Sequence, residues 1–263
     1  MRSFLLGITI ASFLLDPPAN SQNMSPQRSF DDEAVAAVRQ ESQADLPLRA
    51  AWIPSLGDDL IFLKTQGRLS PGTEVPVVRF YRVTVAPYEL RGTTIQGQVV
   101  EVDNENEWLV AIDQDGRRRY VLQGSRDPVA KFNDLIRGLR MRVGDADTAL
   151  AVFDFFLKAV RGEQARSRVV GDVMKLQSVA LEDFRSRFPS ASSRSKFDKW
   201  WKALPTTARD DIRPAQAEDT KGQGFVVRYT LYDRGVLRKK TLLINADGTV
   251  TNPSSEKHSR KVQ

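Results

Sequence analysis

The sequence predicts an α+β protein with an N-terminal antiparallel β meander, a central helical segment around one buried core helix, and a C-terminal β-hairpin. Short apolar runs separated by turn residues fill residues 60–122 and indicate strands. Apolar residues at helical spacing follow in 128–204. Two long β-prone runs, 225–232 and 236–244, are joined by Asp-Arg-Gly and predict the hairpin.

Residues 1–21 have the composition of a secretory signal peptide. Arg2 gives a positive start, and the apolar run 4–15 is 12 residues long, too short for a typical membrane span. Ala19-Asn20-Ser21 supplies the small residues that a signal peptidase reads, so we expect cleavage after Ser21. No later stretch is apolar enough to cross a membrane, so we expect an exported chain, periplasmic or secreted, without a transmembrane span. An uncleaved N-terminal anchor is the alternative.

Residues 22–54 are predicted to be a linker with one short helix. Residues 31–43 place Ala34, Val35 and Val38 at helical spacing behind acidic residues in the first turn. Pro47 and Pro54 predict irregular chain around Trp52.

Residues 55–125 are predicted to form a β-rich subdomain. Its expected strands are 60–65, 75–85, 93–102, 108–113 and 119–122. Gly116 closes an Asp-Gln-Asp-Gly turn between the last two, where a positive φ is needed.

Residues 126–252 are predicted to form a second subdomain of helices and a C-terminal hairpin. Pro128 suits the first turn of a helix, and the very apolar segment 145–162 is the expected core helix, capped by Asp145 or Asp147. Asp154 and Lys158 form an expected i,i+4 pair on its polar side.

Further segments complete this half. Residues 166–188 are predicted to be helical, with a break near Gly171 or Ser178 and an inward face of Val173, Met174, Leu181, Phe184 and Phe188. Residues 190–195 are predicted to be a loop, 196–204 a short helix ended by Pro205, 206–223 irregular, and 253–263 a disordered tail. A curved sheet around one long helix, as in cystatin-like or NTF2-like folds, would suit this half as an analogy of architecture only.

Composition excludes several kinds of chemistry. The chain has no cysteine and a single histidine, His258, in the predicted tail. Disulfides, thiolate nucleophiles and cysteine-ligated metals are therefore absent, and a catalytic triad would lack its imidazole base. We expect no catalytic residues, no metal site and no cofactor.

One acidic cluster keeps a hydrolase open as an alternative. Glycoside hydrolysis needs only two carboxylates at a suitable separation, and Asp103, Glu105 and Glu107 lie together with Asn104 near a predicted hairpin turn. The same cluster lacks the full spacing of a calcium loop.

The most unusual local feature is the segment KFDKWWKAL, residues 196–204. Phe197, Trp200, Trp201 and Leu204 lie on one predicted face, flanked by Lys196, Lys199 and Lys202. The predicted ligand or partner contacts among them are Phe197, Trp200, Trp201, Lys196 and Lys199, either on an anionic membrane or by stacking on sugar. The alternative is that the tryptophans pack on the core helix or on the final hairpin.

The net charge is +6, from 39 basic and 33 acidic residues, and favours anionic partners weakly. The sequence therefore favours an exported, non-catalytic, envelope-associated protein that binds an unknown protein, glycan or anionic envelope surface. The first alternative is a carboxylate-dependent extracytoplasmic hydrolase. The second is a nucleic-acid-binding protein, which applies only if residues 1–21 are not a signal peptide. An exported protein is not expected to bind nucleic acid.

Overall fold

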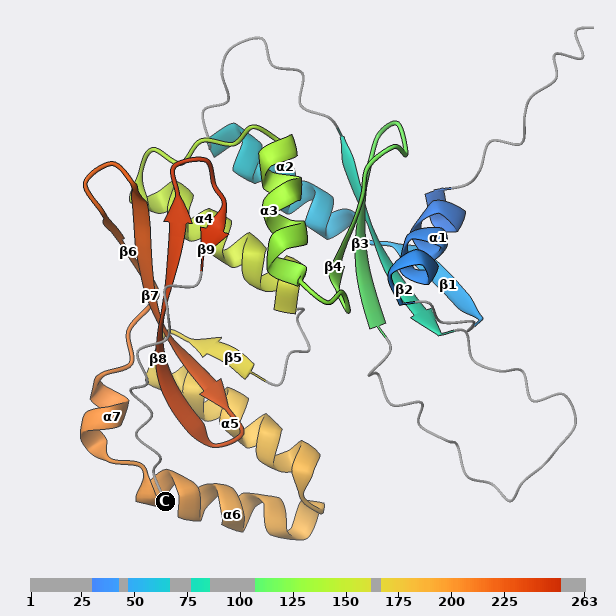
Figure 1. The fold of residues 1–263 in the computed structure, drawn as a ribbon. Coiled ribbons are helices and arrows are strands. Elements are labelled where there is room, and N and C mark those ends of the chain that lie inside the picture. The colour runs from blue at the N-terminus through green and yellow to red at the C-terminus, as the bar shows by residue number, and fades with distance from the viewer. Residues whose placement is uncertain (1–29, 43–46, 67–76, 86–106, 162–166, 252–263) are drawn as a thin grey trace, which may run out of the picture.

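Two antiparallel sheets with helices between and beside them make up the protein (Figure 1). The computed structural model describes residues 30–42, 47–66, 77–85, 107–161 and 167–251. The predicted leader, the expected strand 93–102 and the predicted tail lie outside these residues. The predicted α+β class, with its N-terminal meander and C-terminal strands, is confirmed.

Sheet A is the predicted meander, with strand order β1-β2-β3-β4. Its strands are β1 (Leu48–Trp52), β2 (Val78–Val85), β3 (Glu107–Asp113) and β4 (Arg119–Gln123). Gly116 has the expected positive φ, 68°, in the turn between β3 and β4. The prediction of irregular chain around Trp52 is wrong, because residues 48–52 pair with β2 from Leu48↔Val85 to Trp52↔Tyr81.

Each face of sheet A is buried against different helices. Helix α1 (Phe30–Ser42) covers one face and inserts Ala34, Ala37 and Val38 against β2, β3 and β4. On the opposite face, Phe80 and Leu109 point into the main core. Because both faces are covered, β3 reads as a nearly continuous apolar run instead of alternating.

The prediction of a strand at 60–65 is wrong, because these residues lie in helix α2 (Pro54–Gln66). Pro54 occupies the first helical turn, where its missing N–H costs nothing. Leu56, Leu60 and Leu63 recur at helical spacing and are buried in the main core. A six-residue apolar run fits a strand or a buried helix equally well, and the run alone could not decide between them.

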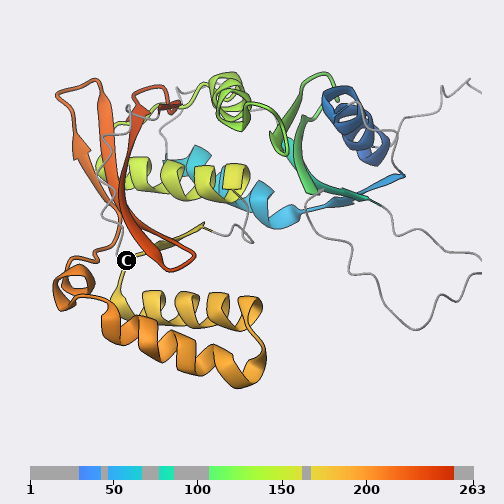
Figure 2. The ribbon, with the colours of Figure 1, turned by 60° about the horizontal axis from the view of Figure 1, so that its bottom comes forward.

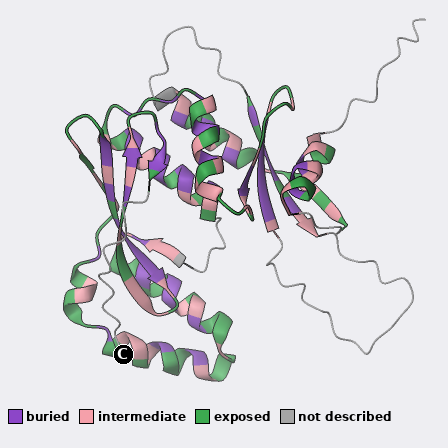
Figure 3. Cartoon of the chain, viewed as in Figure 1, coloured by how far each residue is buried: buried purple, intermediate pink, exposed green. Residues whose placement is uncertain are grey.

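Helix α4 (Ala146–Phe156) is the predicted core helix, and its burial is confirmed (Figure 3). Asp145 Oδ1 accepts from the backbone N–H of Thr148 at 2.7 Å, as the sequence predicts for an N-cap. A π-helical turn, η2 (Leu157–Arg161), continues it. The salt bridge of Lys158 is with Asp59 of α2, Nζ to Oδ2 at 2.7 Å, while its predicted i,i+4 partner Asp154 interacts with it only as a nearby opposite charge.

Sheet B packs against α4 through one of its faces. It contains β5 (Ser167–Val170), β6 (Gln216–Asp219), β7 (Gly224–Asp233), β8 (Val236–Asn245) and β9 (Val250–Thr251). β5 and β6 pair with successive halves of β7, and β8 and β9 follow on its other side. Tyr229 of β7 contacts Phe153 of α4, with ring centroids 4.8 Å apart. The predicted hairpin is confirmed, and β6 is a strand in a region that was predicted to be irregular.

Successive side chains of β7 point to opposite faces of sheet B and therefore belong to two different hydrophobic cores. Leu231 belongs to the main core around α4, whereas its neighbour Tyr232 points to the other face of the sheet. On that other face lie α5 (Val173–Arg187), α6 (Ser190–Ala203) and α7 (Thr206–Asp210). Figure 2 shows α5 and α6 side by side and antiparallel, with α6 on the outside.

Four predictions for this part of the chain are wrong. Residues 167–170 form β5, so α5 begins only after the predicted break at Gly171, and Val173 and Met174 in its first turn are exposed instead of inward. The inward row is set by Leu176, Val179, Ala180 and Phe184. The predicted loop 190–195 is the first half of α6, and α7 replaces part of the expected irregular stretch.

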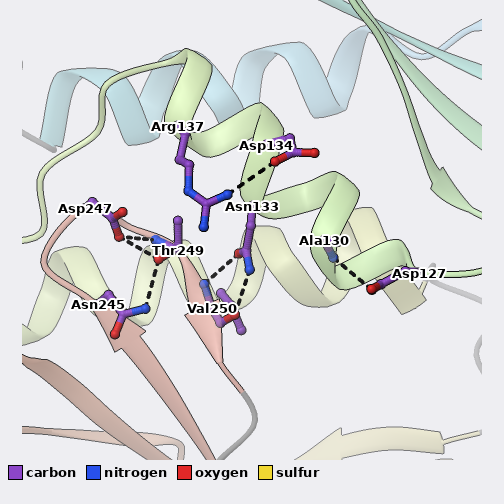
Figure 4. Close-up of polar contacts among 9 residues, drawn as sticks. All are labelled: Asp127, Ala130, Asn133, Asp134, Arg137, Asn245, Asp247, Thr249 and Val250. Atoms are coloured by element: carbon purple, nitrogen blue, oxygen red, sulfur yellow. Dashed lines mark hydrogen bonds and ion pairs between the residues drawn. The ribbon is translucent and has the colours of Figure 1, made fainter.

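A side-chain amide closes the outer edge of sheet B (Figure 4). Asn133 of α3 (Pro128–Gly138) donates from Nδ2 to the Val250 carbonyl at 2.9 Å and accepts on Oδ1 from the Val250 N–H at 2.7 Å. The amide therefore acts as a substitute for a neighbouring strand. Gly248 in the adjoining turn has φ +79°, and a Cβ there would lie 2.9 Å from Ile136 Cγ2, so α3 and this turn pack too closely for a side chain.

Candidate functional site

Helix α6 carries the predicted contact residues, and its sequence explains its bounds. Proline flanks it on both sides: Pro189 precedes the first turn and Pro205 comes after the end. Ser193, in the second turn, is buried, and its hydroxyl donates to the Ser190 carbonyl at 3.1 Å. This local bond satisfies a hydroxyl that burial would otherwise leave without a partner.

The aromatic side chains of α6 point toward the protein. Phe197 is 1% exposed and lies between Phe184 of α5 and Trp201, with centroid separations of 6.1 Å and 5.9 Å. Trp200 packs edge-on against Tyr232, with centroids 5.8 Å apart. Its indole N–H donates to the Gly235 carbonyl in the β7–β8 turn at 2.9 Å. Trp200 therefore holds α6 against the final hairpin, one of the two alternative packing partners that the sequence indicates for the tryptophans.

The lysines of α6 lie on a different side of the helix from its aromatic rings. Lys196, Lys199 and Lys202 are exposed and follow one another at three-residue intervals, a spacing that places them along one side of a helix. Lys196 Nζ lies 3.6 Å from the centre of the Phe188 ring, a cation–π contact at the edge of the row. We call these three residues the lysine row. The five predicted contacts therefore do not form one surface.

Helix α5 is held against β7 by a polar network beside the aromatic cluster. The Tyr232 hydroxyl donates to Asp183 Oδ2 at 2.6 Å, and Arg187 donates to the same oxygen at 2.5 Å. Burial and then this carboxylate raise the pKa of Tyr232 above its ordinary value, because both disfavour the phenolate. Arg168 of β5 and Glu182 of α5 add a bidentate pair at 2.6 and 3.0 Å, and the hydrogen bond lowers the pKa of Glu182.

The acidic cluster is only partly described. Asp103, Asn104 and Glu105 lie outside the described residues, and Glu107 Oε1 lies 2.6 Å from Arg82 Nε on the neighbouring strand. Such a cross-strand pair is an ordinary way to stabilise a sheet. Within the described residues, no group of three or more histidine, cysteine or acidic side chains could hold a metal ion.

Two of the basic regions of the chain differ in how their cations are arranged. Residues 185–202 hold six basic and one acidic residue, and residues 117–142 hold eight basic and two acidic ones. The second region spreads over the β3–β4 turn, α3 and the loop after it, and several of its cations are paired, such as Arg137 with Asp134 at 3.2 Å. In the first region, by contrast, the lysine row lies on one helix.

The free cations of the first region define the candidate site. Among the described residues, no ion pair is found for Lys199, Lys202 or Arg185 of α5, whereas Arg194 pairs with Asp198 of the same helix at 3.2 Å. Lys202 flanks the same predicted face but was not among the five predicted contacts, and neither was Arg185.

Comparison with protein-family models, with curated proteins and with solved structures gives no match. In the part of the chain that is described, every helix is too short or too polar to cross a bilayer.

Proposed function

We propose that the protein is an exported, non-catalytic protein of the bacterial envelope that binds an anionic partner through the lysine row of α6. The leader composition supports export, and the lack of cysteine and of any histidine before His258 supports a non-catalytic role. The observation that carries the proposal is the division of α6 into an aromatic side that holds the fold and a cationic side that is left exposed.

This division matters because it separates binding from folding. Removing an exposed lysine without an ion pair changes stability by no more than a few tenths of a kcal/mol. The same side chain can still attract an anionic surface, because long-range attraction depends on charge and not on close packing. The lysine row can therefore be altered without disturbing the rest of the protein.

Cell fractionation tests the proposal. We expect the protein, produced with its leader, to begin at Gln22 after export and to be found with the envelope. Changing Lys196, Lys199 and Lys202 together to glutamine should move most of it to the soluble periplasmic fraction, with thermal unfolding lowered only slightly by loss of the contact between Lys196 and Phe188.

A matched variant controls for net charge. Changing Arg117, Arg140 and Arg142 together to glutamine removes the same charge from the other basic region, which lies at the opposite end of the molecule from α6 (Figure 1). This control should stay with the envelope. Recovery of intact Met1 in the cytosol would contradict export, and equal loss in both variants would contradict a specific role for α6.

A further inference from the structure

We infer that the anionic partner of α6 is the surface of a lipid bilayer rich in acidic phospholipids, an inference that rests on the proposed function. Lys196, Lys199 and Lys202 extend over about 9 Å of helix at 1.5 Å per residue. α6 is the outermost element below sheet B in both ribbon views (Figures 1 and 2). Charges spread along the outer side of an outer helix suit an extended anionic plane better than a small anion, which needs converging donors.

The neighbouring helix carries two further exposed residues that bear on the inference. Because α6 runs back along α5, the start of α5 lies beside the end of α6, where Lys202 is located. Met174 in the first turn of α5 is 81% exposed, the highest value among the exposed large apolar side chains of the described residues. Arg185, near the other end of α5, adds a fourth cation without an ion pair among the described residues. An exposed flexible apolar side chain on the same pair of helices as the cations is a combination found on proteins that lie on membrane surfaces.

The aromatic rings argue against a nucleic acid as the partner. Proteins that bind single strands present exposed rings on which bases stack. Here Phe197 is buried, and Trp200 is half-buried with its N–H bonded to Gly235. Trp201 is stacked on Phe197, and Arg209 lies over its ring at 5.3 Å from the centroid. The rings are thus engaged within the protein, whereas the lysine ammonium groups are single charges that suit headgroups without fixed geometry.

The number of cations sets the expected strength of binding to an acidic bilayer. Each basic residue near an acidic membrane contributes several-fold to binding, so four of them correspond to a preference of roughly 1,000-fold for acidic over neutral bilayers. Binding of this strength is reversible and is weakened strongly by salt, since the Debye length falls from about 10 Å at 0.1 M to about 3 Å at 1 M. The protein would therefore adsorb to the bilayer without being anchored in it.

Vesicle sedimentation with the purified mature chain tests the inference. We expect binding to vesicles of phosphatidylcholine mixed with phosphatidylglycerol, little binding to phosphatidylcholine alone, and release by salt at about 1 M. The triple lysine-to-glutamine variant should bind on the order of 100-fold more weakly. The control with Arg117, Arg140 and Arg142 changed to glutamine should lose far less, and Met174→Ser should lose a few-fold.

Three outcomes would overturn the inference: equal binding to both kinds of vesicle, no effect of the lysine changes, or tighter binding to a single-stranded oligonucleotide than to acidic vesicles. The two proposals fail separately. If the lysine row retains the protein in the envelope but the purified chain ignores acidic vesicles, the bilayer is the wrong partner and the proposed function stands. If the lysine changes affect neither measurement, both proposals fail.

Discussion

Replacing Phe197 with alanine is expected to lower the free energy of unfolding by about 3–5 kcal/mol, the range measured for buried phenylalanines. Phe197 is 1% exposed and contacts the rings of Phe184, Trp200 and Trp201. Its removal leaves a cavity between α5, α6 and β7 that these large, rigid rings cannot easily fill. Chemical denaturation of the mature chain measures the effect.

Lys199→Ala is the matched control on the same helix. Its side chain is exposed and has no ion pair among the described residues, so the variant should unfold within about 0.5 kcal/mol of the unaltered protein. A Phe197→Ala variant as stable as this control would show that the aromatic side of α6 does not hold the fold.

Replacing Asn133 with alanine is expected to cost about 2–4 kcal/mol, because two backbone groups of Val250 each lose a partner in a half-buried setting. The destabilisation should affect the edge of sheet B more than the rest of the protein. In native-state hydrogen exchange, the Val250 N–H should lose most of its protection, while amides in the middle of β7 should keep theirs.

Asp134→Ala is the neighbouring control on α3. It removes only an exposed ion pair with Arg137, and such pairs contribute less than about 1 kcal/mol. If Asn133→Ala and Asp134→Ala destabilise the protein equally, the amide is not the partner that closes the edge of sheet B.

The elements that could be predicted from sequence were those whose signals agree with one another. Helix α4 combines a capping aspartate with an apolar composition that only a covered helix tolerates, and the two longest strands, β7 and β8, are rich in β-prone residues and joined by a clear turn signal. Helix α2 was misassigned because its apolar run is short, and only its packing against α4 and sheet A selects the helical period.

The predictions for the start of α6 and for the inward face of α5 were wrong for different reasons. Serine-rich residues 190–195 resemble a loop, and they are helical because Phe197 and Trp200 fix the second half of the same helix in the core. In α5, Met174 was placed inward because the helix was expected to begin before β5. Asn133 gave no signal, since its partner lies 117 residues away in sequence.

The structure separates the predicted contact residues of α6, with the aromatic rings turned toward the protein and the lysines exposed. The sequence identified α6 as unusual and named Lys196 and Lys199, yet an amphipathic pattern cannot show whether an aromatic side faces a membrane or the protein's own core. The acceptor for Trp200 is a backbone carbonyl of the β7–β8 turn, 35 residues away, and only the tertiary structure reveals it.

Quenching of tryptophan fluorescence by brominated acyl chains tests the division of α6 most directly. The experiment uses a Trp52→Phe variant, because Trp52 is an exposed tryptophan on β1. On acidic vesicles that demonstrably bind this protein, we expect the emission to be neither quenched nor shifted, since Trp200 and Trp201 stay in the protein while the lysines contact headgroups. Strong quenching on binding would show that the rings enter the bilayer and would contradict the account.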